Sequence, residues 1–178
     1  EEIEEFVLRN RRTRVRIALA AAQEQGGTLT LLNNVNLVTQ VFVNSGTFTL
    51  DLNGHTLTSE YNATLVVSGG SLTIQDSKGG VISSTSSDGN AVWRLDGTVT
   101  VLSGSITSKL IWESGTVSLQ GGAFRSLNRT AAGSWLSAIP EGKALEGDGQ
   151  ITDASAKELI KEDGFYVLAD HEKHDWQA

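Results

Sequence analysis

One pattern of strand, glycine turn and strand occurs four times in this 178-residue chain, and it limits the possible folds more than any other feature. Each copy has a short apolar strand, a turn ending in glycine, and then a Thr or Ser followed by alternating apolar and polar residues. The four copies are Val41–Leu50, Leu65–Ile74, Val92–Val101 and Leu110–Leu119. Their turn glycines are 24, 27 and 18 residues apart. A repeat of this length with strands and no helices predicts a solenoid, in which each unit buries its apolar face against the next.

Alternation decides which side chains of the repeats face the core, because successive side chains of a strand point to opposite sides. The expected inner positions are Phe48, Leu50, Leu72, Ile74, Val99, Val101, Val117 and Leu119. The polar residues between them should form an outer ladder of Thr49, Thr73, Thr100 and Ser118. After a second glycine turn, each copy has one more apolar residue, which is Leu57, Ile82, Ile106 or Phe124. Leu29, Leu31, Val35 and Leu37 have the same spacing and predict an opening coil. The turn glycines Gly46, Gly70, Gly97 and Gly115 should therefore stack at one corner.

An antiparallel β-sandwich is the alternative all-β fold. A sandwich predicts hairpin turns at about 8–12-residue spacing, but it does not predict one register of strand, turn and strand that repeats. We therefore predict an all-β fold, a short single-stranded right-handed parallel β-helix, with its coils in residues 28–127.

Both ends of such a solenoid are open strand edges, which promote aggregation unless something covers them. Residues 1–27 predict an N-terminal capping helix, because Val15, Ala18, Leu19 and Ala22 recur at helical spacing before a glycine pair. Residues 128–178 are expected to form a small mixed C-terminal cap and a junction to a further module. Within it, the capping-box pattern Ser155–Glu158 predicts a short helix through Leu159 and Ile160, and Phe165–Leu168 predicts a strand.

Several phrases of the chain resemble a known group of proteins. Leu50–Leu57, Ser71–Ser77 and Gly97–Gly104 are similar to phrases that recur in exported surface proteins of Gram-positive, often gut-dwelling, bacteria. Those proteins have right-handed parallel β-helices of the pectin-lyase-like type, and Ala20–Leu32 resembles the way such domains begin. The resemblance covers residues 15 to 127 best, and it implies an extracellular or cell-surface location. It implies no particular activity, because this scaffold carries lyases, hydrolases, adhesins and inert stalks.

Charge and composition limit the classes of partner that this chain is expected to bind. Fourteen Lys and Arg residues against twenty-one Asp and Glu residues give a net charge of −7, which disfavours nucleic acids and anionic membranes. The chain has no cysteine and no run of about twenty apolar residues, so we expect neither disulfides nor membrane insertion. We expect a monomer within a larger multidomain protein, with a glycan or a host or cell-surface ligand as its partner, and with signal and anchor segments outside this chain.

The apolar alternation breaks where Trp93, Arg94, Trp112 and Glu113 occur, and a broken pattern is typical of functional positions. Trp93 and Trp112 fall in the same strand of adjacent coils, one position away from equivalence. Exposed together, they would offer an aromatic surface for a sugar, with Arg94 and Glu113 as hydrogen-bonding groups. Buried, they would cover one end of the core. Because the two tryptophans differ by one position, we expect one to be shielded and the other partly open.

The sequence signals for other catalytic or metal-binding sites are weak. Asp51, Asp76 and Asp96 occur in successive coils but at different positions, which favours turn carboxylates over a catalytic pair. His55 follows an Asn-Gly turn, and His171 and His174 form one isolated pair near the end of the sequence. We therefore expect no catalytic residue, metal or cofactor, and we expect a non-enzymatic spacer or adhesive, glycan-contacting module. The alternative is a carbohydrate-active enzyme, a polysaccharide lyase or glycoside hydrolase, on the same scaffold.

Overall fold

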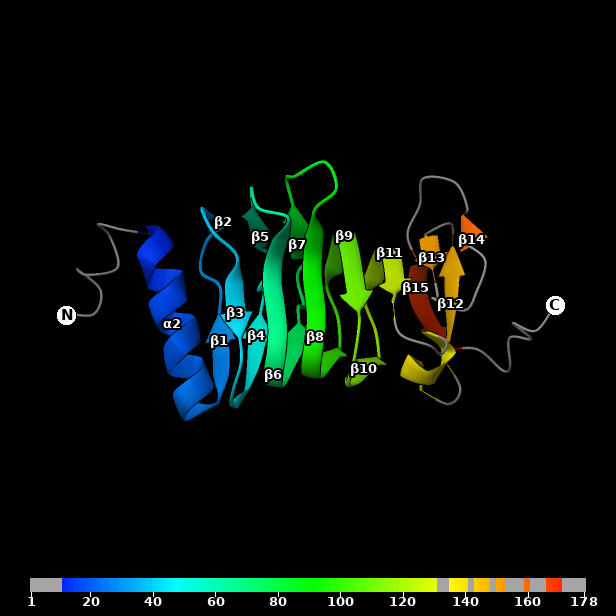
Figure 1. Ribbon diagram of the computed structural model, residues 1–178, viewed down its shortest axis with the longest axis horizontal. Helices are drawn as coiled ribbons and strands as arrows, with labels where there is room; N and C mark the ends of the chain where they lie inside the picture. The colour runs from blue at the N-terminus through cyan, green and yellow to red at the C-terminus, as the bar shows by residue number, and fades with distance from the viewer. Residues whose placement is uncertain are drawn as a thin grey trace.

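The computed structural model describes residues 11–130, 135–140, 143–147, 150–152, 159–160 and 166–170. It shows one curled sheet of mainly parallel strands, with a helix at one end and a group of short strands at the other (Figure 1). This confirms the all-β class and the parallel, solenoid-like stacking of the repeats. The antiparallel sandwich is wrong, because every strand pair between residues 28 and 129 is parallel.

The parallel strands form three ladders. The first ladder contains β1 (Thr28–Thr30), β4 (Thr47–Asp51), the second halves of β6 (Ala63–Gln75) and β8 (Asn90–Val101), and β10 (Thr116–Leu119). The second contains β2 (Val35–Leu37), β5 (Thr56–Ser59), β7 (Val81–Ser84) and the first residues of β9 (Ser105–Trp112) and β11 (Ala123–Arg129). The third contains β3 (Val41–Val43), the first halves of β6 and β8, the ends of β9 and β11, and β13 (Gln150–Thr152).

The predicted columns of the core are confirmed. All eight inner positions of the first ladder are 2% exposed or less, and they pair in register from coil to coil. Leu57, Ile82, Ile106 and Phe124 form a second buried column in the second ladder. The outer residues Thr49, Thr73, Thr100 and Ser118 stand beside one another and are half-buried. Because every coil repeats the same alternation, each one covers the apolar face of its neighbour.

The four turn glycines stack at one corner, as predicted. All four have a positive φ, between 67° and 87°, which favours residues without a Cβ. The stacking is also close. A Cβ on Gly97 would lie 2.5 Å from the carbonyl oxygen of Gly70, and a Cβ on Gly70 would lie 2.6 Å from that of Gly46. The corner therefore needs glycine both for backbone conformation and for space.

Helix α2 (Arg11–Gln25) lies against the first coil (Figure 1). Its buried face includes Leu19 and Ala22, which are 1% and 8% exposed. The side chain of Gln23 also serves the open edge of β3: its Oε1 accepts the Asn44 N–H at 3.0 Å, and its Nε2 donates to the Phe42 carbonyl at 3.2 Å. The helix thus covers apolar side chains and also satisfies backbone groups at the edge of the sheet.

The C-terminal strands pair differently from the coils. β15 (Tyr166–Asp170) runs antiparallel to β12 (Lys143–Gly147) and to β11, which confirms a strand close to the predicted Phe165–Leu168. The predicted helix through Leu159 and Ile160 is wrong, because these residues form β14, antiparallel to β13. Pairing with the open edge of β13 satisfies backbone groups that a local helix would leave unpaired, so the tertiary contact overrides the capping pattern. Ser155–Glu158 lies outside the described residues.

Candidate functional site

The two tryptophans of the predicted site lie on opposite sides of the third ladder. In the register of β8 and β9, Trp93 stands beside Ile111 and Arg94 beside Trp112, so the tryptophans are offset by one position. Trp112 points inward and is 5% exposed, whereas Trp93 is on the outer face and half-buried. The expectation that one tryptophan is shielded and the other partly open is confirmed.

Trp93 and Glu113 form a fixed pair on the outer face. The Trp93 Nε1–H donates to Glu113 Oε1 at 2.8 Å, and Glu113 is itself half-buried. The backbone supports the pair, since the Glu113 N–H donates to the Arg94 carbonyl at 2.9 Å. The indole and the carboxylate therefore come from adjacent coils and hold each other in one orientation.

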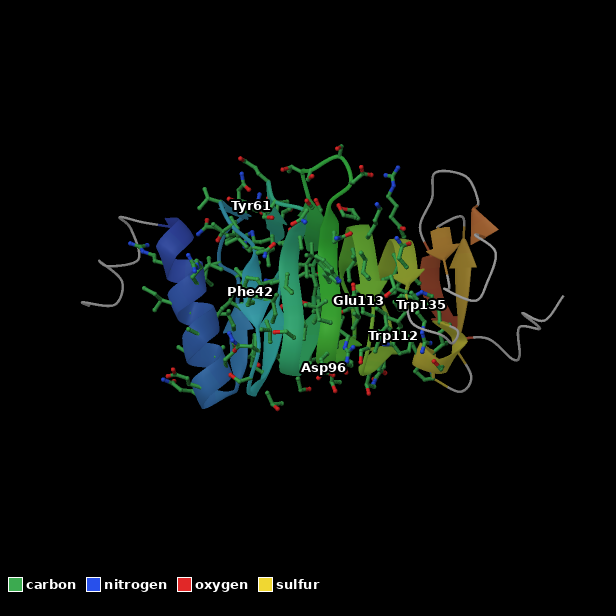
Figure 2. The ribbon with its side chains drawn as sticks, in the orientation of Figure 1. Phe42, Tyr61, Asp96, Trp112, Glu113 and Trp135 are labelled. Carbon is green, nitrogen blue, oxygen red and sulfur yellow. The ribbon has the colours of Figure 1, made fainter. Side chains whose placement is uncertain are left out.

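A row of apolar side chains extends this outer face along the third ladder. Phe42, Val66, Trp93 and Ile111 occupy successive positions in register. Phe42 is 50% exposed, whereas Val66, between the two aromatic positions, is 2% exposed. Figure 2 shows Phe42 and Glu113 on the side of the sheet that faces the viewer. Phe42 was not among the predicted site residues, although its place opposite Val66 and Trp93 in the repeat was a usable signal.

Arg94 points into the core and is 0% exposed, so its side chain does not reach a ligand on the outer face. Its Nη2 donates to the Gly97 carbonyl and lies 4.0 Å from the Asp96 carboxylate, which is exposed. The guanidinium also occupies the space that a Cβ on Gly115 would need. Desolvation by burial lowers the pKa of Arg94, and the charge of Asp96 opposes this shift. Arg94 therefore joins its own turn to the glycine corner of the next coil.

Trp112 belongs to a structural cluster near the C-terminal end of the coils. Its Nε1–H donates to the Gly115 carbonyl at 3.2 Å, and its ring lies 5.2 Å from that of Trp135, edge to face. The guanidinium carbon of Arg129 lies 3.7 Å from the centre of the Trp112 ring, a cation–π contact. Figure 2 shows Trp112 and Trp135 close together beside the last coils. Of the four predicted residues, Trp93 and Glu113 thus lie on the outer face, and Arg94 and Trp112 lie inside.

The candidate carboxylates serve mainly in turns. Asp51 Oδ1 accepts the Asn53 N–H at 2.9 Å, and the buried Asp76 accepts four backbone N–H groups. Asp96 is exposed beside Arg94. The backbone N–H of His55 donates to the Leu52 carbonyl at 2.8 Å, within the Asn-Gly turn. These contacts agree with the turn interpretation of Asp51 and Asp76.

Metal-ligand clusters and membrane-spanning helices are absent from the part of the chain that the structure describes. There, no three His, Cys, Asp or Glu side chains gather as metal ligands would. His171 and His174 lie outside that part. No helix within it has the length and apolar character needed to cross a bilayer.

Comparison with protein-family models, with curated proteins and with solved structures gives no match to this chain.

Proposed function

We propose that this chain is a non-enzymatic module of an exported bacterial cell-surface protein, and that it serves as a spacer and contacts glycans through the outer face of its third ladder. The observation that carries the proposal is the Trp93–Glu113 pair, an outward-facing indole fixed at 2.8 Å by a carboxylate from the next coil. Because these two side chains are held in place before a ligand arrives, binding costs little side-chain entropy.

The chemistry of the outer face suits a sugar. The C–H face of a pyranose packs on an aromatic plane, and Glu113 has a second carboxylate oxygen that can accept a hydroxyl proton. Phe42 lies two coils from Trp93 in register, about 10 Å by strand spacing. Two aromatic side chains at this separation support contact with more than one sugar unit of a chain that runs across the strands.

The spacer role follows from the ladders. Parallel strands that are joined by crossover connections wind right-handedly in about 98% of cases, so we infer that the curled sheet is a right-handed parallel β-helix of the pectin-lyase-like type. Coils stacked on one continuous apolar core form a stiff unit, which is suited to holding neighbouring modules apart. The resemblance to exported Gram-positive surface proteins supports the location.

The chemistry of the carboxylates favours a binding module over a carbohydrate-active enzyme. Glycoside hydrolysis needs two free carboxyl groups that face each other across the sugar. The carboxylate of Asp76 is occupied by backbone N–H groups of two coils, and Asp51 is bonded within its own turn.

A glycan array with labelled wild-type protein and the Trp93→Ala variant tests the proposal. We expect specific glycans to bind the wild type and to lose most of their signal with Trp93→Ala, while the melting temperature changes little. Tyr61→Ala is the matched control, since Tyr61 is an exposed aromatic residue outside the row, at 49% exposure. Equal binding by wild type and Trp93→Ala, or no bound glycan, would contradict the glycan-contacting role. Release of reducing ends or unsaturated products from a polysaccharide panel would favour the enzyme.

A further inference from the structure

A second surface of the molecule, on the first ladder, presents regular rows of hydroxyl groups. One row contains Thr47, Ser71, Thr98 and Thr116, and the other contains Thr28, Thr49, Thr73, Thr100 and Ser118. We call these the hydroxyl rows. Neighbouring hydroxyls along a row are about 4.8 Å apart, and the two rows are about 7 Å apart, by the geometry of parallel strands.

Most hydroxyls of the rows are unused by the protein itself. Within the described part of the chain, Ser118 Oγ accepts a bond from Gln120 Nε2 at 3.4 Å, and the other hydroxyls of the rows make no side-chain hydrogen bond. Some hydroxyls elsewhere in the coils are engaged. Thr64 Oγ1, for example, donates to the Ser83 carbonyl at 2.6 Å, and Ser84 Oγ donates to the Tyr61 carbonyl at 2.7 Å. The rows therefore keep their donors and acceptors for groups outside the protein.

The rows end at a groove between β10 and the 3-10 helix η1 (Trp135–Ala138). Figure 1 shows this short yellow helical turn beside β10. The groove has a volume of about 530 Å³, within the usual range of ligand sites. Thr116, Ser118 and Gln120 line its strand side. Ser137, Ile139 and Pro140 line the opposite side.

The lining of this groove is uncharged. Its described polar groups are hydroxyls and one amide, which can both donate and accept, and its apolar groups include Ile139 and Pro140. A ligand with charged groups would find no opposite charge among the lining residues themselves, and the net charge of −7 disfavours an anion. Arg129, which donates to Ser137 Oγ at 3.3 Å, lies against the Trp112 ring. A neutral sugar carries the matching groups, because its hydroxyls are donors and acceptors and its C–H faces are apolar.

We propose that the groove between β10 and η1 binds a neutral carbohydrate of one or two sugar units. The hydroxyls of Thr116 and Ser118 and the Gln120 amide contact the sugar hydroxyls, and Ile139 and Pro140 contact a C–H face. Both hydroxyl rows lead away from the groove. Their hydroxyls nearest the groove offer further contacts to a longer sugar chain. This site is separate from the Trp93–Glu113 pair, which lies on the third ladder.

Nuclear magnetic resonance titration of the full chain with neutral disaccharides tests the site. Cellobiose, maltose, mannobiose and diacetylchitobiose are the probes, and digalacturonate is the charged comparison. We expect at least one neutral disaccharide to shift the backbone amides of residues 116–120 and 137–139 at roughly millimolar concentration. Thr116→Val and Gln120→Ala should each weaken that binding by about three- to tenfold, the range for one lost hydrogen bond.

Two controls keep this test separate from the test of the outer face. Thr28→Val removes a hydroxyl at the far end of the row that contains Ser118, four coils away and about 19 Å from Ser118, and should leave binding unchanged. Trp93→Ala should leave the shifts of residues 116–120 and 137–139 unchanged, whatever it does to shifts around the outer face, so that failure of one site is distinguishable from failure of the other. The proposal is overturned if no neutral disaccharide shifts these amides, if digalacturonate binds as well, or if Thr28→Val weakens binding as much as Thr116→Val.

Discussion

Replacing Asp76 with asparagine should lower the free energy of unfolding by about 3 kcal/mol, although the two side chains have nearly the same size. The Asp76 side chain is 8% exposed and ties two coils together. Oδ1 accepts the Gly54 N–H of the preceding coil at 2.6 Å. Oδ2 accepts three N–H groups of its own turn, from Lys78 at 2.9 Å, Gly79 at 2.6 Å and Gly80 at 2.8 Å.

The magnitude follows from these four bonds. An asparagine has one acceptor oxygen, so in either orientation its NH₂ group faces at least one N–H donor, and that donor loses its partner at a cost of about 1–3 kcal/mol. The bonds that remain lose the carboxylate charge and are weakened, so the total is expected at the upper end of that range, about 3 kcal/mol.

Urea unfolding at pH 7, followed by tryptophan fluorescence, measures the change. Asp51→Asn is the matched control, because Asp51 is half-buried and accepts one backbone N–H that an amide oxygen can also accept, and its other bond is a long one of 3.4 Å from the Gln75 side chain. We expect the control to cost less than about 1 kcal/mol. Equal, small losses in both variants would refute the idea that the Asp76 carboxylate ties the coils.

The contribution of Asp76 should also depend on pH. Burial acts to raise the pKa of Asp76, but the N–H groups of Gly54, Gly80, Lys78 and Gly79 outweigh it, and the net pKa is lowered. Because the folded pKa lies below the unfolded value of about 3.9, the stabilisation is fully present above that value. It is lost as the pH falls through the folded pKa, so wild type and Asp76→Asn should converge in stability at acid pH. A difference that stays constant down to acid pH would contradict this.

Three further experiments test the packing. Leu72→Asp should prevent folding, because a carboxylate would enter the dry core. Thr73→Asp, on the outer side, should change the circular dichroism spectrum and the melting temperature only slightly. Equal damage by both variants would mean that the faces are misassigned. Gly97→Ala should destabilise the protein far more than Gly79→Ala in urea titrations. Both glycines have a φ of 87°, but only a Cβ on Gly97 would meet neighbouring atoms. Similar losses of stability in the two variants would show that close stacking is unimportant. Trp112→Ala should cost about 3–5 kcal/mol in the same titrations, because the ring is buried, and a loss below about 1 kcal/mol would contradict its place in the core.

Local alternation and the glycine spacing were enough to predict the coils. The buried column that contains Phe48 and Leu72, the outer threonines and the stacked turn glycines were all predictable, because each depends on a period of two that every copy repeats. The one-position offset of Trp93 and Trp112 predicted their opposite faces for the same reason.

The positions of individual polar groups were not predictable in this way. The turn role of Asp76 was expected, but the sequence did not show that the carboxylate also reaches Gly54 in the preceding coil. Arg94 was predicted as a ligand-contacting residue, yet its guanidinium lies inside and crosses to the glycine corner. Asp76 with Gly54 and Arg94 with Gly115 are contacts between residues about twenty positions apart in the sequence. The length of a coil does not predict how closely two such side-chain and backbone groups approach each other.

The sequence by itself therefore determined which residues of the coils face inward, because strand periodicity is a local property of the backbone. Only the tertiary structure decided how the sheet ends. Leu159 and Ile160 form β14 beside β13, although the preceding residues carry a helix-capping pattern. The tertiary structure also places η1 beside β10, which forms the groove at the end of the hydroxyl rows. Both outcomes depend on open strand edges, whose unpaired backbone groups exist only after the coils have stacked.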